Sequence, residues 1–299
     1  MSFKYLKVNE QRALSEFEFK RLFDAALNKI PSKKGKLILF DCIFSFFVDE
    51  LGKSKVAIAI SGGSDSMALA ALARESLGED RIRGLIVDHQ LQKFGVTENA
   101  EQVQESLSKL GIRSDILKLN WKEDFSVSPG KLMMKSREER YRALFDACGK
   151  ENIPLLLTGH NLEDDIVTMF YRISRMSGLD GLAGMKQATT FPFAAPNSDS
   201  TFILRPFLPI PKHRLINTCI ERGIPWTEDR SNDDLSFRRN ECLQALIDLQ
   251  KENENISTDS LVKMLESYKG HRSFIHQKGR FAHDLNYFIL SVFSIRCIG

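Results

Sequence analysis

The amino-acid sequence predicts an α/β fold, in which helices cover both faces of a parallel, twisted sheet and a small helical segment follows. Between residues 56 and 176, short apolar runs typical of buried strands alternate with longer segments of helical periodicity. A turn rich in serine and glycine joins the first apolar run to the first of these helices. Such alternation requires right-handed crossovers, which place the strands parallel and bury them under helices on both faces.

The expected strands are short runs dominated by aliphatic side chains. They are Val56–Ile60, Ile82–Asp88, Ser114–Leu119, Pro154–Thr158 and Thr201–Leu204. The expected helices carry apolar residues at three- and four-residue spacing. They are Met67–Leu77, Glu98–Leu110, the basic segment Ser136–Cys148 and Leu162–Met176. From Lys212 onward the pattern is mostly helical.

Two polar stretches, Lys122–Gly130 and Lys186–Ser200, are expected to be loops because turn-forming residues are frequent in them. The two most apolar stretches are Leu37–Leu51 and Leu285–Ile298, and a charged residue interrupts each. Both are shorter than the ~20 residues of a membrane helix, so we expect no membrane partner. The periodicity of the first indicates a buried amphipathic helix.

A length of 299 residues corresponds to about two domains. The change of pattern after the last expected strand places their boundary. We interpret residues 1–54 as a helical N-terminal extension, 55–215 as the α/β domain and 216–299 as a helical segment.

The composition excludes several classes of protein. Hydrophobic residues make up 42% and charged residues 27%, which excludes a disordered or fibrous chain. The five cysteines are scattered without a CxxC pair, which argues against a disulfide framework, a zinc–thiolate site or an iron–sulfur cluster. The net charge of +3 neither requires nor excludes a nucleic acid. The first 30 residues lack a secretory apolar core, and their acids disfavour a transit peptide. We expect a cytoplasmic protein, or a mitochondrial matrix protein if the source is eukaryotic.

The most informative segment is the loop between the first strand and the first helix, Ser61-Gly62-Gly63-Ser64-Asp65-Ser66. Its glycines allow a sharp turn, and its amides, its hydroxyls and the helix N-terminus suit a phosphate or pyrophosphate. Asp65 would repel phosphate unless Mg²⁺ bridges the two. The loop is not a Walker A motif, because no lysine precedes Ser66. The alternative is an ordinary turn in which Asp65 or Ser66 caps the helix.

Polar residues also follow two other strands, where ligands of parallel sheets bind. Asp88 and His89 end the second strand, and His160 and Asp164 follow the fourth. These could contact a nucleotide, and Asp164 could hold Mg²⁺; a polar strand end or a structural histidine is the alternative.

Two arginines, Arg137 and Arg140, share a face of the basic helix. They could hold phosphate, or they could pair with neighbouring glutamates on a solvated face.

The loop Ser61–Ser66 resembles the PP-loop of N-type ATP pyrophosphatases, which adenylate a carbonyl oxygen and release AMP. Six further elements resemble those of tRNA(Ile)-lysidine synthases, in order and at similar spacing. They are Val87–Leu91 (VDHGLR), Ser136–Tyr141 (ARxxRY), Gly159–Asp164 (GHHxDDQxET), Ser177–Met185 (SGLxGLxGM), Arg205–Leu208 (RPLL) and Trp226–Asn232 (WxEDxSN) followed by Arg239.

The resemblance implies a PP-loop fold and an ATP-dependent ligase with Mg²⁺ that joins free lysine to C2 of the wobble cytidine of a CAU-anticodon tRNA(Ile). A homodimer is left open. The implied catalytic residues are Asp65, Asp164 and Arg137, of which the two aspartates hold the metal. The implied nucleotide-binding residues are Ser61, Gly62, Gly63, Ser64, Ser66, Asp88, His89, His160 and Arg140. The implied RNA-binding residues are Arg205, Trp226, Asp229, Asn232 and Arg239.

The sequence departs from the family pattern at three positions, where glutamate or arginine is usual: Met133, Val167 and Leu243. These departures keep open a non-catalytic, tRNA-binding paralogue. A tRNA thiolase of the same superfamily is a second alternative, although the lack of CxxC counts against it. A synthetase acting on a small metabolite is the third.

Overall fold

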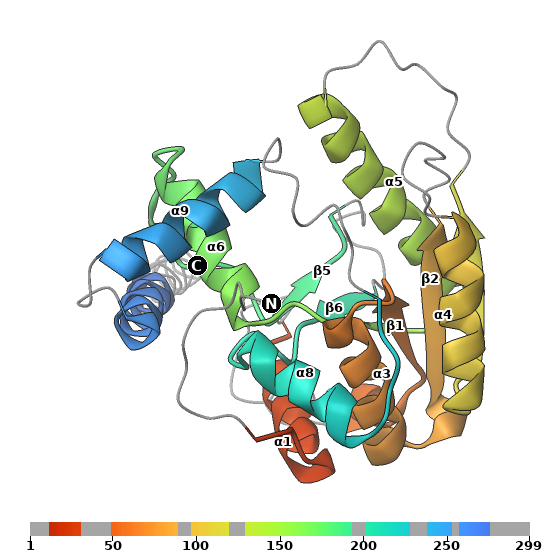
Figure 1. Ribbon diagram of the computed structural model, residues 1–299. Coiled ribbons are helices and arrows are strands. Elements are labelled where there is room, and N and C mark those ends of the chain that lie inside the picture. The colour runs from red at the N-terminus through yellow and green to blue at the C-terminus, as the bar shows by residue number, and fades with distance from the viewer. Residues whose placement is uncertain are drawn as a thin grey trace, which may run out of the picture.

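The computed structural model describes residues 12–30, 49–88, 97–119, 129–192, 201–227, 238–252 and 257–275. Their strands form one six-stranded sheet in the order β3-β2-β1-β4-β6-β5 (Figure 1). The strands are β1 (Val56–Ile60), β2 (Ile82–Asp88), β3 (Ser114–Lys118), β4 (Leu155–Thr158), β5 (Ala188–Thr190) and β6 (Phe202–Leu204). All neighbouring pairs are parallel except β5 and β6, which confirms the predicted α/β class.

Helices precede, connect and follow these strands. They are α1 (Glu16–Leu27), α3 (Ser64–Leu77), α4 (Thr97–Lys109), α5 (Pro129–Lys150), α6 (Leu162–Ile173), α7 (Leu179–Leu182), α8 (Lys212–Glu221) and α9 (Arg238–Glu252). Residues 258–275 form a further helix. Strands β1 and β2 have the predicted bounds, and the four predicted helices agree with α3, α4, α5 and α6 to within a few residues at most of their ends.

The structure corrects two expectations about loops. Strand β5 lies inside the predicted loop Lys186–Ser200, because Ala188–Thr190 pairs with β6 and buries the side chain of Ala188. A three-residue strand is too short to show the alternation of apolar and polar residues that predicts a strand. It forms here because it pairs with β6. Helix α5 begins at Pro129, inside the predicted loop Lys122–Gly130, because proline suits the first position of a helix.

Side chains alternate between two cores across the sheet. On β1, Val56, Ile58 and Ile60 face the core that contains α1, α3, α4 and α8, whereas Ala57 faces the core under α5. Figure 1 shows α1, α3 and α8 grouped on one side of the strands, with α5 on the other. The sheet is therefore covered on both faces, as strand–helix alternation predicts.

A third apolar cluster lies beside the sheet, where α6, α9 and the helix of residues 258–275 pack together (Figure 1). Leu162, Ile166 and Met169 of α6 contact Leu246 of α9 and Leu261 of the last helix. This cluster holds the C-terminal helices against the helix that follows β4.

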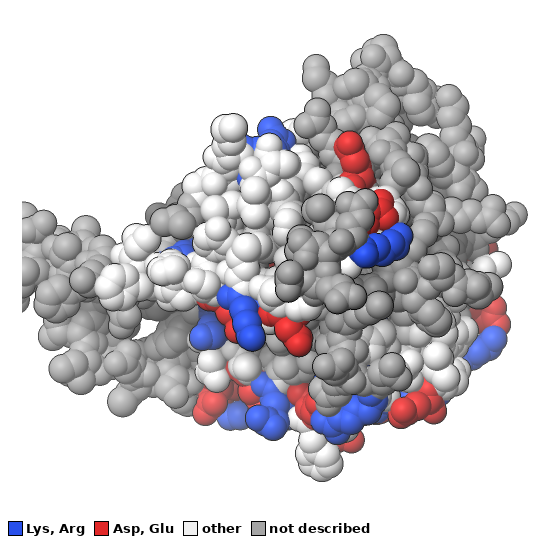
Figure 2. Space-filling view, turned by 60° about the vertical axis from the view of Figure 1, so that its left-hand side comes forward, with Lys and Arg blue, Asp and Glu red and all other residues white. Residues whose placement is uncertain are grey.

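Charged side chains of both signs lie side by side on part of the surface. Figure 2 shows lysines, arginines and acidic residues intermixed along the lower part of one face. None of the helices in the described ranges is long and apolar enough to cross a membrane. Most of the predicted helix Leu37–Leu51 lies outside the described residues, although residues 49–53 are helical.

Helix α1 is joined to α8 by a buried arginine. Arg214, 4% exposed, donates from Nε to the carbonyl oxygen of Arg12 (2.9 Å) and from Nη2 to Oε1 of Glu18 (2.9 Å). Burial alone would raise the pKa of Glu18. The hydrogen bonds from Arg214 and from the Ser15 N–H, with the charges of Arg214 and Arg12, lower it below its ordinary value.

We expect Glu18→Gln to lower the free energy of unfolding by about 1.5–3 kcal/mol at neutral pH, because it removes the charged partner of a buried arginine. A lowered folded-state pKa contributes stability above the unfolded-state value of about 4.3, and this contribution is lost as the pH falls through the folded-state pKa. The difference between variant and wild type should therefore shrink in acid. Urea unfolding between neutral and acidic pH measures it. The exposed Glu16→Gln is the control, and a difference independent of pH would contradict the assignment.

Candidate functional site

The loop Ser61–Ser66 connects the carboxyl end of β1 to the N-terminus of α3, as predicted. Its hydroxyls hold it closed: Ser66 Oγ accepts from the Ser61 N–H (3.2 Å) and donates to the carbonyl oxygen of Gly63 (3.0 Å). Gly63 is the residue before the helix, and no side chain caps the first amides there. Helix amides without a side-chain cap suit an anion such as phosphate.

Gly62 is the residue that shapes this loop. Its φ is +84°, and a Cβ atom there would lie 2.6 Å from Cγ2 of Val103 and 3.0 Å from Oγ1 of Thr227. The Thr227 N–H donates to the carbonyl oxygen of Gly62 (2.9 Å). The segment that follows α8 therefore closes directly on the loop, where only glycine fits.

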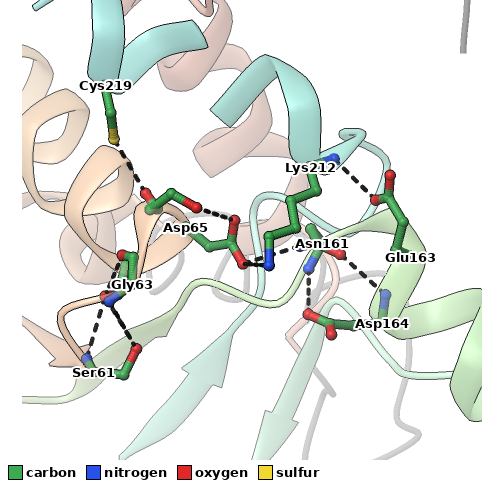
Figure 3. A network of polar contacts seen from close by, with 10 residues as sticks. Ser61, Gly63, Asp65, Asn161, Glu163, Asp164, Lys212 and Cys219 are labelled. Carbon is green, nitrogen blue, oxygen red and sulfur yellow. Dashed lines mark hydrogen bonds and ion pairs between the residues drawn. The ribbon is translucent and has the colours of Figure 1, made fainter. Parts of the chain in front are cut away.

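Asp65 is the centre of a polar network that joins three helices (Figure 3). Its Oδ2 accepts from the side-chain amide of Asn161 (3.1 Å) and lies 3.9 Å from Nζ of Lys212. Asn161 and Asp164 cap α6 reciprocally, each side chain accepting from the other's backbone N–H at 3.0 Å. The network thus brings together Asp65 and Asp164, the two aspartates predicted to hold a metal.

Glu163, in the first turn of α6, belongs to the same network. It is 7% exposed, and its Oε2 accepts from the Lys212 N–H at the start of α8 (2.9 Å). Its Oε1 is buried without a hydrogen-bond partner among the described residues. Val167, where the family pattern has glutamate, is 2% exposed. The acids in the first turn of α6 are Glu163, Asp164 and Asp165, of which Glu163 and Asp164 belong to this network.

Burial and crowding make these carboxyls weak acids. Burial raises the pKa of Asp65 to about 6; the charge of Lys212 opposes this shift, and that of Asp164 adds to it. Burial likewise raises the pKa of Glu163 to about 7, opposed by the backbone hydrogen bond from Lys212 and assisted by Asp164 and Asp65. Such concentrated negative charge is typical of a site that receives a cation.

Lys212 is the functional residue that sequence reasoning missed. It is the first residue of α8 and directs its ammonium group at Asp65 (Figure 3). The loop Ser61–Ser66 contains no lysine, so a cation reaches it from a distant part of the chain. The only signal was its position four residues after the RPFL segment, and that position indicates nothing without knowledge of the strand order.

The oxygen donors of the site fit Mg²⁺ bound together with phosphate. Among the described residues, no three His, Cys, Asp or Glu side chains form a metal site by themselves. Mg²⁺ in phosphate-transfer sites typically takes one or two carboxylates, with phosphate and water completing its shell. Asp65 and Asp164, with the unpartnered oxygen of Glu163 nearby, satisfy that requirement.

Three predicted arginines lie around one tyrosine, apart from the Asp65 network. The guanidinium groups of Arg137 and Arg140 lie 5.0 Å and 6.0 Å from the ring centre of Tyr141. Arg205, 7% exposed, donates to the carbonyl oxygen of Lys186 (2.9 Å), and its Nε is buried without a partner in the described structure. Burial lowers the pKa of Arg205, and the nearby charge of Arg137 lowers it further while Tyr141 opposes. Gathered cations with an unused donor suit an anion.

The remaining predicted residues are placed as follows. Asp88 is buried at the end of β2, and His160 shares a 2.9 Å hydrogen bond with Thr158 after β4. Trp226 is half-buried against the core of α1, α3 and α8. His89, Asp229 and Asn232 lie outside the described residues, as do the side chains of Arg239 and Met133.

Comparison with known proteins identifies the fold and the loop together. A family model described as "PP-loop domain" matches residues 40–249. The chain belongs to the PP-loop family. The PP-loop corresponds to the segment Ser61–Ser66. Its Asp65 connects the loop to Asn161 and Lys212. Among solved structures, a U34-tRNA thiolase from Methanococcus maripaludis shares the fold, with a TM-score of 0.55 and 17% identity over 91% of this chain and 90% of that one.

Curated relatives of this PP-loop chain include tRNA(Ile)-lysidine synthases. That of Rickettsia bellii strain OSU 85-389 is 33% identical over 72% of this chain and 47% of its own length. That of Hyphomonas neptunium is 35% identical over 67% of this chain and 53% of its own length. The chain therefore spans about half the length of the curated relatives that it matches.

We expect Gly62→Ala to destabilise the protein more than Gly78→Ala. Both glycines have positive φ, which costs other residues roughly 1–2 kcal/mol. Only at position 62 would a Cβ atom also collide with neighbours, since nothing lies within 4 Å of a Cβ at position 78. Urea denaturation of the two variants measures the difference in the free energy of unfolding. Equal losses would mean that the contact with Val103 and Thr227 does not constrain the loop.

Proposed function

We propose that this chain is an ATP-dependent ligase that joins lysine to C2 of the wobble cytidine in a CAU-anticodon tRNA(Ile). One observation carries the proposal: the PP-loop, two aspartates and Lys212 converge at one edge of the sheet. The curated relatives of the chain include lysidine synthases, which supports the choice of reaction. The groups proposed to act on the phosphates of ATP are Asp65, Asp164 and Lys212 of this network.

The PP-loop is proposed to bind the phosphates of ATP. The first amides of α3 and the hydroxyls of Ser61, Ser64 and Ser66 would donate hydrogen bonds to the β- and γ-phosphates, which leave as pyrophosphate. Lys212 would approach the same oxygens and stabilise the negative charge that develops on them. Mg²⁺ held by Asp65 and Asp164 would neutralise part of that charge when bound.

The reaction has two parts. The C2 oxygen of cytidine attacks the α-phosphorus of ATP, pyrophosphate departs, and the oxygen becomes part of a good leaving group. The unprotonated amine of lysine then attacks C2 and AMP departs, so that one C–N bond forms and the C2–O bond breaks. Holding three substrates in place can account for ~7–11 kcal/mol of the barrier.

The arginine cluster is proposed to bind anionic parts of these substrates. The guanidinium groups of Arg137 and Arg140 lie close to the ring of Tyr141, and Arg205 interacts with the same residue, which suits phosphate oxygens. The segment of residues 216–299, with Trp226, Asp229, Asn232 and Arg239, is proposed to contact the tRNA. Asp88, His89 and His160 would border the nucleotide.

The test of this function is transfer of radiolabelled lysine to tRNA(Ile) transcripts. We expect lysine to enter only CAU-anticodon tRNA, with release of AMP and dependence on Mg²⁺, because the reacting atom is the C2 oxygen of cytidine. A transcript with uridine at the wobble position is the control. Sulfur incorporation without lysine would assign the chain to the thiolases, and tRNA binding without any reaction would indicate a non-catalytic paralogue.

We expect Asp65→Ala to abolish pyrophosphate release while the melting temperature changes little, because this carboxylate contributes few apolar contacts. Its polar partners are Asn161, Ser64 and Lys212. A steady-state pyrophosphate assay measures it. Wild-type turnover in the variant would exclude the proposed role of Asp65.

We expect Lys212→Met to lower the rate of pyrophosphate release about 100-fold, as for loss of one charge-stabilising donor. Lys212→Arg should retain more of the rate than Lys212→Met, since it keeps the positive charge. The backbone bond from Lys212 to Glu163 survives in both variants, so thermal unfolding should be similar. If the rate of pyrophosphate release falls equally in both variants, the positive charge of Lys212 is not what contributes to the reaction.

A further inference from the structure

Asp165 is a fully buried carboxylate whose two oxygens are held by two different segments. Its Oδ1 accepts from the Met185 N–H (2.5 Å), and its Oδ2 pairs with Nζ of Lys269 (2.6 Å). Asp165 is 0% exposed and lies on α6, next to Asp164 of the site. It therefore joins the loop of residues 177–185 to the helix of residues 258–275.

The loop of residues 177–185 also packs tightly at Gly184. Its φ is +64°, and a Cβ atom there would lie 2.3 Å from Oδ1 of Asp165 and 2.9 Å from Cδ1 of Leu265. Nη1 of Arg172 on α6 donates to the carbonyl oxygens of Gly181 (3.0 Å) and Gly184 (2.9 Å). The glycine-rich loop is thus enclosed between α6 and the helix of residues 258–275.

Lys269 comes from outside the region matched by the PP-loop model, which ends at residue 249. Its helix is held in place by apolar contacts of its own, since Leu261 and Leu265 belong to the cluster with Ile166 and Met169. The ammonium group is consequently presented to Asp165 by a packed helix. Without that cation, an ionised aspartate buried at this position would destabilise the folded state.

We propose that Lys269 is a positioning residue that, through Asp165, holds the loop of residues 177–185 in the conformation that receives tRNA. This inference rests on the proposed function for the identity of the substrate. Basic residues of the segment favour a polyanion: Arg172 donates to two carbonyl oxygens of the loop, and Arg175 and Lys186 flank the loop in the sequence.

Three variants of the full chain separate charge balance from packing. Lys269→Met leaves Asp165 buried without its cation, whereas Lys269→Arg keeps the positive charge. The double variant Asp165→Asn with Lys269→Met removes both charges and keeps an oxygen that accepts from Met185. Lys263→Met, at an exposed position on the same helix, is the matched control.

The first measurement is hydrogen exchange of the amides in residues 177–185, which needs no activity. We expect exchange of the Met185 amide to be roughly tenfold faster in Lys269→Met, because its acceptor loses the ion pair that fixes it. Lys269→Arg, the double variant and Lys263→Met should remain near the wild type. Unchanged exchange in Lys269→Met, or no recovery in the double variant, would overturn the proposed coupling.

The second measurement is the lysine-transfer reaction with varied tRNA. We expect the KM for tRNA to rise severalfold in Lys269→Met with little change in kcat, and to recover in the double variant. Faster exchange with an unchanged KM would overturn the positioning role. If the wild type transfers no lysine, the proposed function fails; the exchange experiment and the Kd for the same tRNA then decide the role of Lys269 by themselves.

Discussion

The close approach of two strand ends determines the geometry of the whole site. Strands β1 and β4 are neighbours, and the residue after β4 is Gly159. A Cβ atom there would lie 3.0 Å from the backbone carbon of Asp65 and 3.1 Å from the backbone nitrogen of Ser66. Because the chain after β4 passes this close to the first turn of α3, Asn161 can reach Asp65. A side chain at position 159 would push α6 away from the PP-loop.

Three helix N-termini meet as a result, and their amides and one ammonium group offset an unusual concentration of carboxylates. Asp164 accepts from the cap of its own helix, Glu163 accepts from the first amide of α8, and Asp65 lies beside Lys212. Each of these interactions joins an acid to positive charge, or to the positive end of a helix dipole. Burial nevertheless raises the pKa values of Asp65 and Glu163, so this compensation is incomplete.

The sequence predicted those parts of the fold and site that depend on local pattern. Buried parallel strands are continuous apolar runs, so β1 and β2 could be placed to the residue, and the PP-loop carries its own signature. Asp65 and Asp164 could be paired because both follow strands at the same edge. Lys212 could not be found, since its contact with Asp65 depends on where α8 packs and not on any local motif. Strand β5 was missed for a similar reason: it is stabilised by pairing with β6, and its own three residues show no strand pattern.

The contacts of α1 with distant residues affect the order in which the protein folds. The Leu14 N–H donates to Oγ1 of Thr218 across 204 residues, and Phe19 packs edge-on against Phe207. During synthesis, the apolar side of α1 leaves the ribosome long before these partners exist. Contacts of such high sequence separation close slowly, and exposed aromatic surface favours aggregation in the interval. The contacts of α1 with Phe207 and Thr218 can therefore form only after about 220 residues have been synthesised.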